Sequence, residues 1–261
     1  MIAPFPSFTA KWHTDTYAAI DPTNPTFSLR GKTVVITGAG SGIGGAIASS
    51  FAKANVSQLA LIGRRANLLE AKRAELLAIS PSTKILVVSA DISNEQEINT
   101  AFEKIAGAFG PLDILVNNAA YFSGAAPSLE DDVKNWFMSF EVNARGTFLV
   151  AQAFLKKAIA AATIVNSELI LDTSLAHKLT SFFAVSTGIT HLPPAQFPGF
   201  SAYAASKIAS TVYLSYVQKE NPNLHVVHVH PGQIVTDMAH KVGMTTPIDL
   251  GAFSGNSHQL A

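Results

Sequence analysis

Short apolar segments alternate with stretches of helical periodicity through most of the chain. The apolar segments at 33–37, 59–62, 85–88 and 114–116 lack the period-two alternation of a strand with one solvated face, which predicts strands buried on both faces. After each of the first three segments, apolar residues recur at spacings of three and four, which predicts helices. Strands that alternate with helices indicate crossover connections and a parallel sheet covered on both sides.

The pattern continues to about residue 230 without an internal repeat. We predict helices at about 128–142 and 144–160, a strand at 162–166, a helix from 201 to about 219 and a strand at 224–230. The predicted fold class is therefore α/β, with a single doubly wound parallel sheet, a Rossmann fold. Residues 1–30 predict an extended N-terminal arm, and residues 31–261 a single domain.

A glycine-rich turn lies between the first predicted strand and the first predicted helix, where residues 37–44 read TGAGSGIG. Glycines permit a tight turn and let the backbone approach a pyrophosphate, whose charge is met by free N–H groups at the helix start. A glycine cluster also arises for steric reasons alone. The strand before it and the helix after it are what favour a dinucleotide site.

The end of the second predicted strand bears on which dinucleotide binds. Dinucleotide folds that prefer NAD place an acid about twenty residues after the glycine turn, where it binds the ribose 2′-hydroxyl. Here the strand ends in Ile62-Gly63-Arg64-Arg65, with no acid. A guanidinium can bind a 2′-phosphate through two hydrogen bonds, so we predict NADP(H) rather than NAD(H), with Arg64 as the ligand. The alternative is a solvated arginine at a helix start.

Tyr203 and Lys207 are four residues apart in a predicted helix and therefore share a face. A tyrosine hydroxyl titrates at about pH 10, too high for easy proton exchange at neutral pH. A nearby ammonium favours the phenolate and makes the tyrosine a usable acid or base. The spacing alone is common by chance, but together with the glycine turn it becomes specific.

With these residues in place, the sequence resembles the short-chain dehydrogenase/reductase family. The resemblance covers residues 31 to about 238 in order and spacing. Its elements are the glycine turn, Asp91-Ile92, Asn117-Asn118-Ala119-Ala120, Asn143 within VNARG, Tyr203 with Lys207, and the segment PGQIVT at 231–236.

The resemblance implies a cofactor role for each matching residue, which makes residues 31–261 an NAD(P)-binding domain. The pyrophosphate would be lined by Gly38, Gly42, Ile43 and Gly44, the adenine by Asp91 and Ile92, the ribose by Asn117, and the nicotinamide carboxamide by Ile234 and Thr236. The cofactor would carry the hydride, and the protein would orient it.

The resemblance also implies the catalytic roles. Tyr203 would pass a proton to or from the substrate oxygen, and Lys207 would bind the nicotinamide ribose and lower the tyrosine pKa. Asn143 would hold a water that links Lys207 to solvent. Together with a hydroxyl residue that the family places after its fifth strand, these residues would form the catalytic set.

Two regions depart from the family pattern. The expected hydroxyl lies soon after the fifth strand, yet Tyr203 follows Asn166 by 37 positions (203 − 166). We interpret a segment near 167–186, at about 168–185, as an insertion and Thr187 as the catalytic hydroxyl, with Ser186 and Ser174 as alternatives. A native surface loop is one explanation of the insertion; a sharper hypothesis is a retained intron. The chain also ends 25 residues after Thr236 (261 − 236), so we expect a fold truncated at its C-terminal end.

The amino-acid composition limits the classes of binding partner that we expect. The 18 basic and 18 acidic side chains leave no net charge and form no basic block, which argues against nucleic acid or an anionic membrane. No run of about 18 apolar residues occurs, so no membrane span is expected. The chain has no cysteine, which excludes disulfides and thiolate chemistry and fits a cytoplasmic location. His228 and His230 share a strand face without His225 or an acid, so no metal site is expected.

The leading hypothesis is an NADP(H)-dependent oxidoreductase that interconverts a carbonyl and a secondary alcohol on a small molecule. Aromatic pocket candidates favour an apolar or aromatic substrate: Tyr121, Phe122, Phe197 and Phe200. Two alternatives stay open, a cofactor-binding protein without redox turnover and an isomerase or dehydratase of the same family. A homo-oligomer also stays open, with contacts reduced by the short C-terminus.

Overall fold

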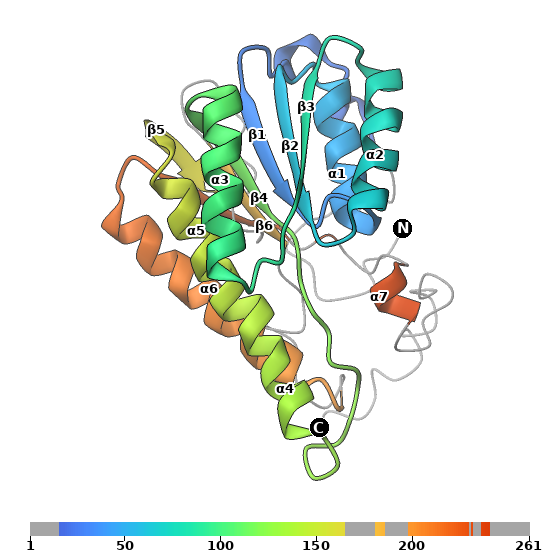
Figure 1. Ribbon diagram of the computed structural model, residues 1–261, viewed down its shortest axis with the longest axis vertical. Coiled ribbons are helices and arrows are strands. Elements are labelled where there is room, and N and C mark those ends of the chain that lie inside the picture. Colours follow the sequence, from blue (N-terminus) through green and yellow to red (C-terminus); the bar gives the residue numbers. More distant parts are fainter. Residues whose placement is uncertain (1–15, 165–180, 186–197, 230, 232–235, 241–261) are drawn as a thin grey trace, which may run out of the picture.

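The structure, a computed structural model, is a parallel sheet with helices on both faces (Figure 1). It describes residues 16–164, 181–185, 198–229, 231 and 236–240. The strand order is β3-β2-β1-β4-β6-β7, and β5 pairs with β4 beside that path. The strands are β1 Thr33–Thr37, β2 Gln58–Gly63, β3 Lys84–Ser89, β4 Leu112–Asn117, β5 Ala158–Ile164, β6 Ser181–Val185 and β7 His225–Val229. The predicted doubly wound fold is confirmed.

The helices form two layers around this sheet. The larger ones are α1 Gly42–Lys53, α2 Ala66–Ile79, α3 Glu95–Phe109, α4 Val133–Phe140, the π-helix η3 Glu141–Gly146, α5 Thr147–Leu155 and α6 Ser201–Glu220; the short α7 spans Asp237–His240. Figure 1 shows α1 and α2 on one side of the sheet, and α3, α5 and α6 on the other. Each layer encloses its own buried apolar cluster.

The first strand shows why the apolar segments lack alternation. Val34 and Ile36 point into the cluster beneath α1 and α2, whereas Val35 points into the cluster beneath α3 and α5. All five residues of β1 are buried, so both faces of the strand need apolar side chains. The central strands are therefore continuous runs of Val, Ile and Leu.

Three predicted elements have different boundaries in the structure. The two helices predicted at 128–142 and 144–160 are one uninterrupted helical rod, made of α4, η3 and α5, which begins at Val133 and ends at Leu155. Asp132 fixes the start, because its side chain accepts a hydrogen bond from the Asn135 backbone N–H at 2.8 Å. The described part of the predicted arm holds two short 3₁₀ turns, η1 Ala18–Ile20 and η2 Pro25–Phe27, rather than an extended chain.

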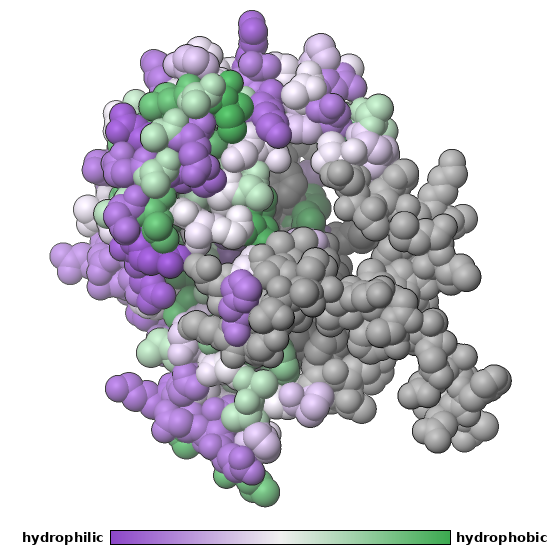
Figure 2. Space-filling view, turned by 90° about the vertical axis from the view of Figure 1, so that its right-hand side faces the viewer, coloured by the Kyte–Doolittle hydropathy of each residue, from purple (hydrophilic) through white to green (hydrophobic). Residues whose placement is uncertain are grey.

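The surface and the helices carry two further observations. On the face shown in Figure 2, hydrophilic residues predominate among those described, and hydrophobic ones lie between them in small groups. Within the described ranges, no helix combines the length and the apolar character that a membrane span requires.

Strands β5 and β6 divide one position of the sheet between them. The predicted strand at 162–166 corresponds to β5, which pairs with the first half of β4, and β6 pairs with the second half. β6 also pairs with β7, so it is an interior strand. Residues 181–185, which we assigned to the insertion, are therefore part of the sheet.

The pairing register measures a surplus of residues at this position. Ile114 pairs with Thr163, and the next residue of β4, Leu115, pairs with Phe182. One step along β4 thus corresponds to 19 along its partner (182 − 163), which is 18 more than a continuous strand needs. The segment 168–185 has the same length (185 − 168 + 1). The surplus in the pairing register therefore equals the length of the segment that we predict to be an insertion.

This register yields a first prediction. Deletion of residues 164–181 removes the 18 surplus residues and keeps both pairings, so the variant should fold. Without these residues, the entropic free energy needed to close the chain between the two strands falls by about 2 kcal/mol. That saving should raise the unfolding midpoint by about 4–8 °C, measured by circular dichroism.

The matched control deletes residues 164–180, one residue fewer. It places Ser181 opposite Leu115 and turns every following side chain to the other face of the sheet. The unfolding midpoint of this control should lie below that of the first deletion by at least about 4–8 °C. Equal midpoints for the two deletions would contradict the register argument.

Candidate active site

A cleft of about 420 Å³ opens where the central strands end at their carboxyl termini, the usual place for a ligand in an open parallel sheet. It brings together nine of the predicted residues: Gly38, Gly42, Ile43, Arg64, Asp91, Ile92, Tyr203, Lys207 and Thr236. Gly44, Asn117 and Asn143 are buried and do not line the cleft. Ile234, Thr187, Ser186 and Ser174 lie outside the described residues.

The glycine turn is shaped by backbone conformation and close approach. Gly38 has φ +69°, a left-handed conformation that glycine adopts without strain. A Cβ on Gly44 would lie 2.3 Å from the Gly38 carbonyl oxygen, so the first turn of α1 can pack on the loop only without a side chain there. These two features hold the start of α1 open toward the cleft, as a pyrophosphate site requires.

Thr37 and Asn118 join the glycine turn to the end of β4. The Thr37 Oγ1 accepts hydrogen bonds from the backbone N–H groups of Asn118 at 2.9 Å and Ala119 at 3.1 Å. The Asn118 side-chain Nδ2 in turn donates to the Thr37 carbonyl oxygen at 3.0 Å. Sequence reasoning gave neither residue a role of its own, although both stand in the matching motifs.

The two arginines after β2 occupy different positions. The Arg64 Nη1 lies 3.6 Å from the Asp91 Oδ2, and the Arg64 side chain is 69% exposed. The Arg65 Nη2 donates to the Ser41 Oγ at 2.9 Å, which places this guanidinium directly on the glycine turn. Arg64, Arg65 and Ser41 all line the cleft. Arg65 and Ser41 are therefore candidate phosphate ligands that the sequence argument missed.

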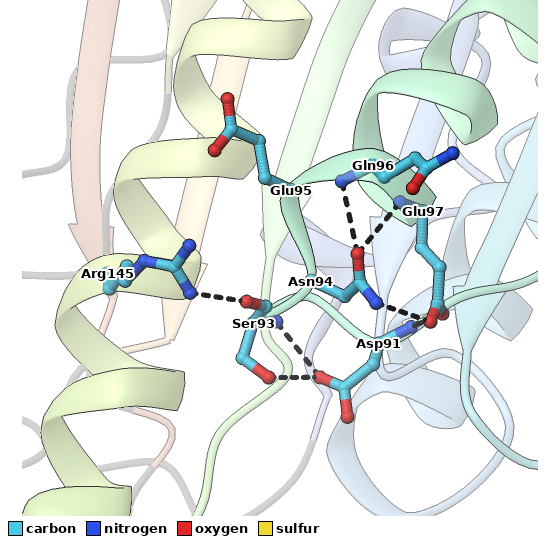
Figure 3. A pocket seen from close by; sticks show the side chains of 7 residues that line it. All are labelled: Asp91, Ser93, Asn94, Glu95, Gln96, Glu97 and Arg145. Atoms are coloured by element: carbon cyan, nitrogen blue, oxygen red, sulfur yellow. Dashed lines mark hydrogen bonds between the residues drawn. The ribbon is translucent and has the colours of Figure 1, made fainter.

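Asp91 belongs to a compact turn after β3, drawn in Figure 3. Its Oδ1 accepts from the Ser93 N–H at 2.9 Å and from the Ser93 Oγ at 2.7 Å. Burial raises the pKa of the Asp91 carboxyl, but the hydrogen bonds from Ser93 and the charge of Arg64 outweigh burial, so its pKa lies below the ordinary value. Asp91 is therefore ionised at neutral pH.

A second pocket lies next to this turn and is lined by polar and charged side chains (Figure 3). Arg145 lines the far side of this pocket, and its Nη1 donates to the Ser93 carbonyl oxygen at 2.7 Å. The hydrogen bonds among its lining residues stabilise the start of α3, where the Asn94 side chain caps the N–H groups of Gln96 and Glu97. These contacts give the second pocket a structural role.

Tyr203 and Lys207 project from the first two turns of α6 into the cleft. The Lys207 Nζ lies 5.9 Å from the centroid of the Tyr203 ring. Burial raises the pKa of the Tyr203 hydroxyl to about 12 and lowers the pKa of the Lys207 amine to about 8. The resemblance implied a lowered tyrosine pKa. In the structure, desolvation by burial gives the opposite direction.

Asn143 lies in the π-helix and is 2% exposed. Its Oδ1 accepts from the Tyr121 N–H at 2.7 Å, and its Nδ2 donates to the Tyr121 carbonyl oxygen at 2.8 Å and to the Ser206 Oγ at 3.0 Å. The side chain therefore joins the loop after β4, the π-helix and α6. A π-turn commonly marks a functional position, because it redirects one side chain out of the helical pattern.

Asn117 acts from behind the cleft rather than in its lining. Its Nδ2 donates to the Thr147 Oγ1 at 2.8 Å, and the Thr147 Oγ1 donates to the Asn143 carbonyl oxygen at 2.6 Å. The end of β4 is thus joined to the first turn of α5 and to the π-helix. Asn117 therefore supports the site through these hydrogen bonds and does not line the cleft.

Aromatic side chains cover the cleft beside Tyr203. Phe122 packs edge-on against the Tyr203 ring, with centroids 5.4 Å apart and an interplanar angle of 84°, and against Phe200 at 5.0 Å. Tyr121 and Phe122 line the cleft, whereas Phe197 lies outside the described residues. Across the part of the chain that the structure describes, no group of three potential metal ligands converges.

Comparisons with known proteins agree with this geometry. A family described as short chain dehydrogenase matches residues 32–168. The short chain dehydrogenase mpl6 of Monascus purpureus is 33% identical over 238 residues, which cover 88% of this chain and 73% of that protein. The D-threitol dehydrogenase of Mycolicibacterium smegmatis is 31% identical over 196 residues, which cover 72% and 73%.

A solved structure extends the comparison to the fold. A short chain dehydrogenase from Burkholderia cenocepacia, in complex with NADP, is 28% identical, covers 80% of this chain and 77% of its own, and superposes with a TM-score of 0.66. The sequence matches, the sheet order and the cleft therefore lead to one conclusion: this chain belongs to the short-chain dehydrogenase/reductase family of oxidoreductases.

Proposed function

We propose that the protein is an NADP(H)-dependent oxidoreductase that interconverts a carbonyl and a secondary alcohol on a small apolar or aromatic molecule. The observation that carries the proposal is the shared cleft: Tyr203 and Lys207 open onto the same space as the glycine turn. A proton donor and a dinucleotide site in one cleft are what carbonyl reduction requires.

The residues present fit a nicotinamide dinucleotide. The bare backbone at Gly38, with Gly44 packed closely against it, would form the pyrophosphate cradle, and Asp91 and Ile92, which line the cleft, would hold the adenine. Lys207 and Thr236 also line the cleft, Thr236 beside Gly42. Lys207 would hold the nicotinamide ribose, and Thr236, together with Ile234, would hold the carboxamide. When bound, the cofactor supplies or accepts the hydride.

The charge near β2 supports NADP(H). Arg64 and Arg65 both line the cleft, and Arg65 already donates to Ser41 on the glycine turn. Two guanidiniums and a hydroxyl suit a 2′-phosphate, which accepts several charge-assisted hydrogen bonds. The Burkholderia cenocepacia relative was solved with NADP, which is consistent with this preference.

Proton transfer is assigned to Tyr203. Because burial keeps its pKa at about 12, the hydroxyl is protonated at neutral pH and can donate to the oxygen of a carbonyl as that oxygen gains charge. The neighbouring Lys207, when protonated, stabilises the phenolate that remains. Asn143 positions the helix that carries both. We retain Thr187 as the second hydroxyl on the substrate oxygen, since it is the second residue after β6 ends at Val185.

The aromatic wall supports the proposed substrate class. Tyr121 and Phe122 line the cleft next to Tyr203, so a flat or apolar group beside the carbonyl would replace water there. The Tyr121 hydroxyl donates to the Asn135 Oδ1 at 2.7 Å, which satisfies its polar end. The wall therefore presents apolar ring surface toward the substrate.

The first functional prediction concerns the proton donor. Tyr203→Phe keeps the ring and its contact with Phe122 but removes the hydroxyl, so kcat should fall about 10²–10⁴-fold with NADPH affinity kept. NADPH oxidation over a panel of aromatic and aliphatic ketones measures this. Tyr213→Phe on the same helix is the control, because Tyr213 packs on Phe148. A wild-type protein that binds NADPH without turnover would favour the cofactor-binding alternative.

The second functional prediction concerns cofactor choice. Arg64→Ala and Arg65→Ala should each weaken NADPH about tenfold or more and NADH only slightly, because each loses a charge-assisted bond to the 2′-phosphate. Arg65→Ala should have the larger effect, since the charge of Arg64 is partly neutralised by the Asp91 carboxylate, whereas the partner of Arg65 is the uncharged Ser41 hydroxyl. Arg73→Ala, in an exposed ion pair on α2, is the control. Equal losses for both cofactors would refute the selectivity.

The third functional prediction concerns stability. The pKa of Lys207 is about 8 in the folded chain, against an ordinary lysine value of 10.5, so between these pH values the unfolded chain binds more protons. The wild-type protein should therefore gain stability as the pH rises from about 8 to about 10.5. Lys207→Met should be more stable at pH 7 by about 3 kcal/mol, and this difference should shrink over the same range.

The measurement is urea unfolding at several pH values. Lys219→Met, which removes an exposed lysine from the same helix, is the control and should change stability little. A constant difference between Lys207→Met and wild type from pH 7 to pH 10.5 would contradict the linkage.

A further inference from the structure

Helix α6 carries both Tyr203 and Lys207, so its placement decides where both groups lie. Two side-chain hydrogen bonds tie its first turns to the α4–η3 rod among the described residues. One is at the exposed start of the helix, where the Trp136 Nε1 donates to the Ser201 Oγ at 3.0 Å. The other is buried and joins Asn143 to Ser206, between the two active groups.

Ser206 is fully buried and uses its hydroxyl twice. Its Oγ accepts from the Asn143 Nδ2 at 3.0 Å and donates to the Tyr203 carbonyl oxygen at 2.9 Å. It stands three residues after Tyr203 and directly before Lys207. One hydroxyl therefore links the amide of the π-helix to the turn of α6 that carries both groups.

We propose that Ser206 is a positioning residue that fixes Tyr203 and Lys207 against Asn143. This inference rests on the proposed function and adds a residue to it. Removing the hydroxyl leaves one N–H of a buried amide without its acceptor and frees the turn of α6 from the π-helix. Water can then reach Lys207, and the alignment of Tyr203 with the substrate oxygen becomes looser.

Ser210 provides a matched comparison one turn further along α6. Its Oγ donates to the Lys207 carbonyl oxygen at 2.8 Å, the same backward bond that Ser206 makes to Tyr203. Ser210 is also buried, with 8% of its surface exposed. The two serines thus differ chiefly in the bond to Asn143, which the structure gives to Ser206.

The first measurement is kinetic. Ser206→Ala should lower kcat about tenfold or more with a smaller change in KM, whereas Ser210→Ala should stay within about twofold of wild type. Adding Asn143→Ala to Ser206→Ala should cost no more than Asn143→Ala alone, because both remove one coupled bond. Additive losses, or equal losses in the two serine variants, would overturn the proposal.

The second measurement needs neither cofactor nor turnover. Acetylation of Lys207 by an amine-reactive ester, followed across pH by mass spectrometry, reports how far its amine is desolvated. We expect a midpoint near the pKa of about 8 in wild type and Ser210→Ala. In Ser206→Ala it should rise by about half a unit or more, because water reaches the amine.

This second readout separates the two proposals. If wild type shows no turnover but Ser206→Ala alone shifts the labelling, the oxidoreductase proposal fails and the positioning role stands. If wild type is active and all three proteins label alike, the positioning role fails. Ser206→Cys, which keeps the side chain close in size but offers a weak hydrogen-bond partner, should shift in the same direction and serves if Ser206→Ala does not fold.

Discussion

The amide of Asn143 is the contact on which the arrangement of this site depends. It lies in a π-turn within the rod of α4, η3 and α5, and it binds the loop after β4 through both backbone groups of Tyr121. The same amide reaches α6 through Ser206. Asn143 thus makes these contacts from a π-turn, a local irregularity that is frequent at functional sites. Because the amide is buried, the loss of any one of these hydrogen-bond partners would lower the stability of the fold.

Desolvation sets the chemistry of the two groups that this contact positions. Burial raises the pKa of Tyr203 and lowers that of Lys207, so both favour their neutral forms more than they would in water. Burying these two ionisable groups costs free energy, so the polar groups around them must have their hydrogen bonds satisfied. The hydrogen bonds of Thr37, Asn117 and Thr147 supply that support from the ends of β1 and β4 and the start of α5. The polar network thus permits charged chemistry in an apolar surrounding.

Local signals explain what the sequence could predict. The strands β1 to β4, the glycine turn and the face shared by Tyr203 and Lys207 follow from periodicity and short spacing, and the structure reproduces them. The π-turn at Asn143 was beyond such reasoning, because nothing in the local pattern distinguishes it from a helix boundary. The bond between Arg65 and Ser41 spans 24 positions and that between Asn143 and Ser206 spans 63, so both depend on tertiary placement. The direction of the Tyr203 pKa shift depends on burial, which also requires the fold.

The position shared by β5 and β6 bears on the proposed role of Thr187 as the second hydroxyl. A parallel strand beside β4 must end at the same edge of the sheet as Asn117, where the cleft opens. With β6 in that position the chain leaves the sheet at Val185, directly before Ser186 and Thr187. Removing 168–185 from the sequence would instead let 164–167 fill the position, and the next residues would again be Ser186 and Thr187, because the surplus is 18 residues in both cases. The proposal that Thr187 assists Tyr203 is therefore independent of which segment forms the strand.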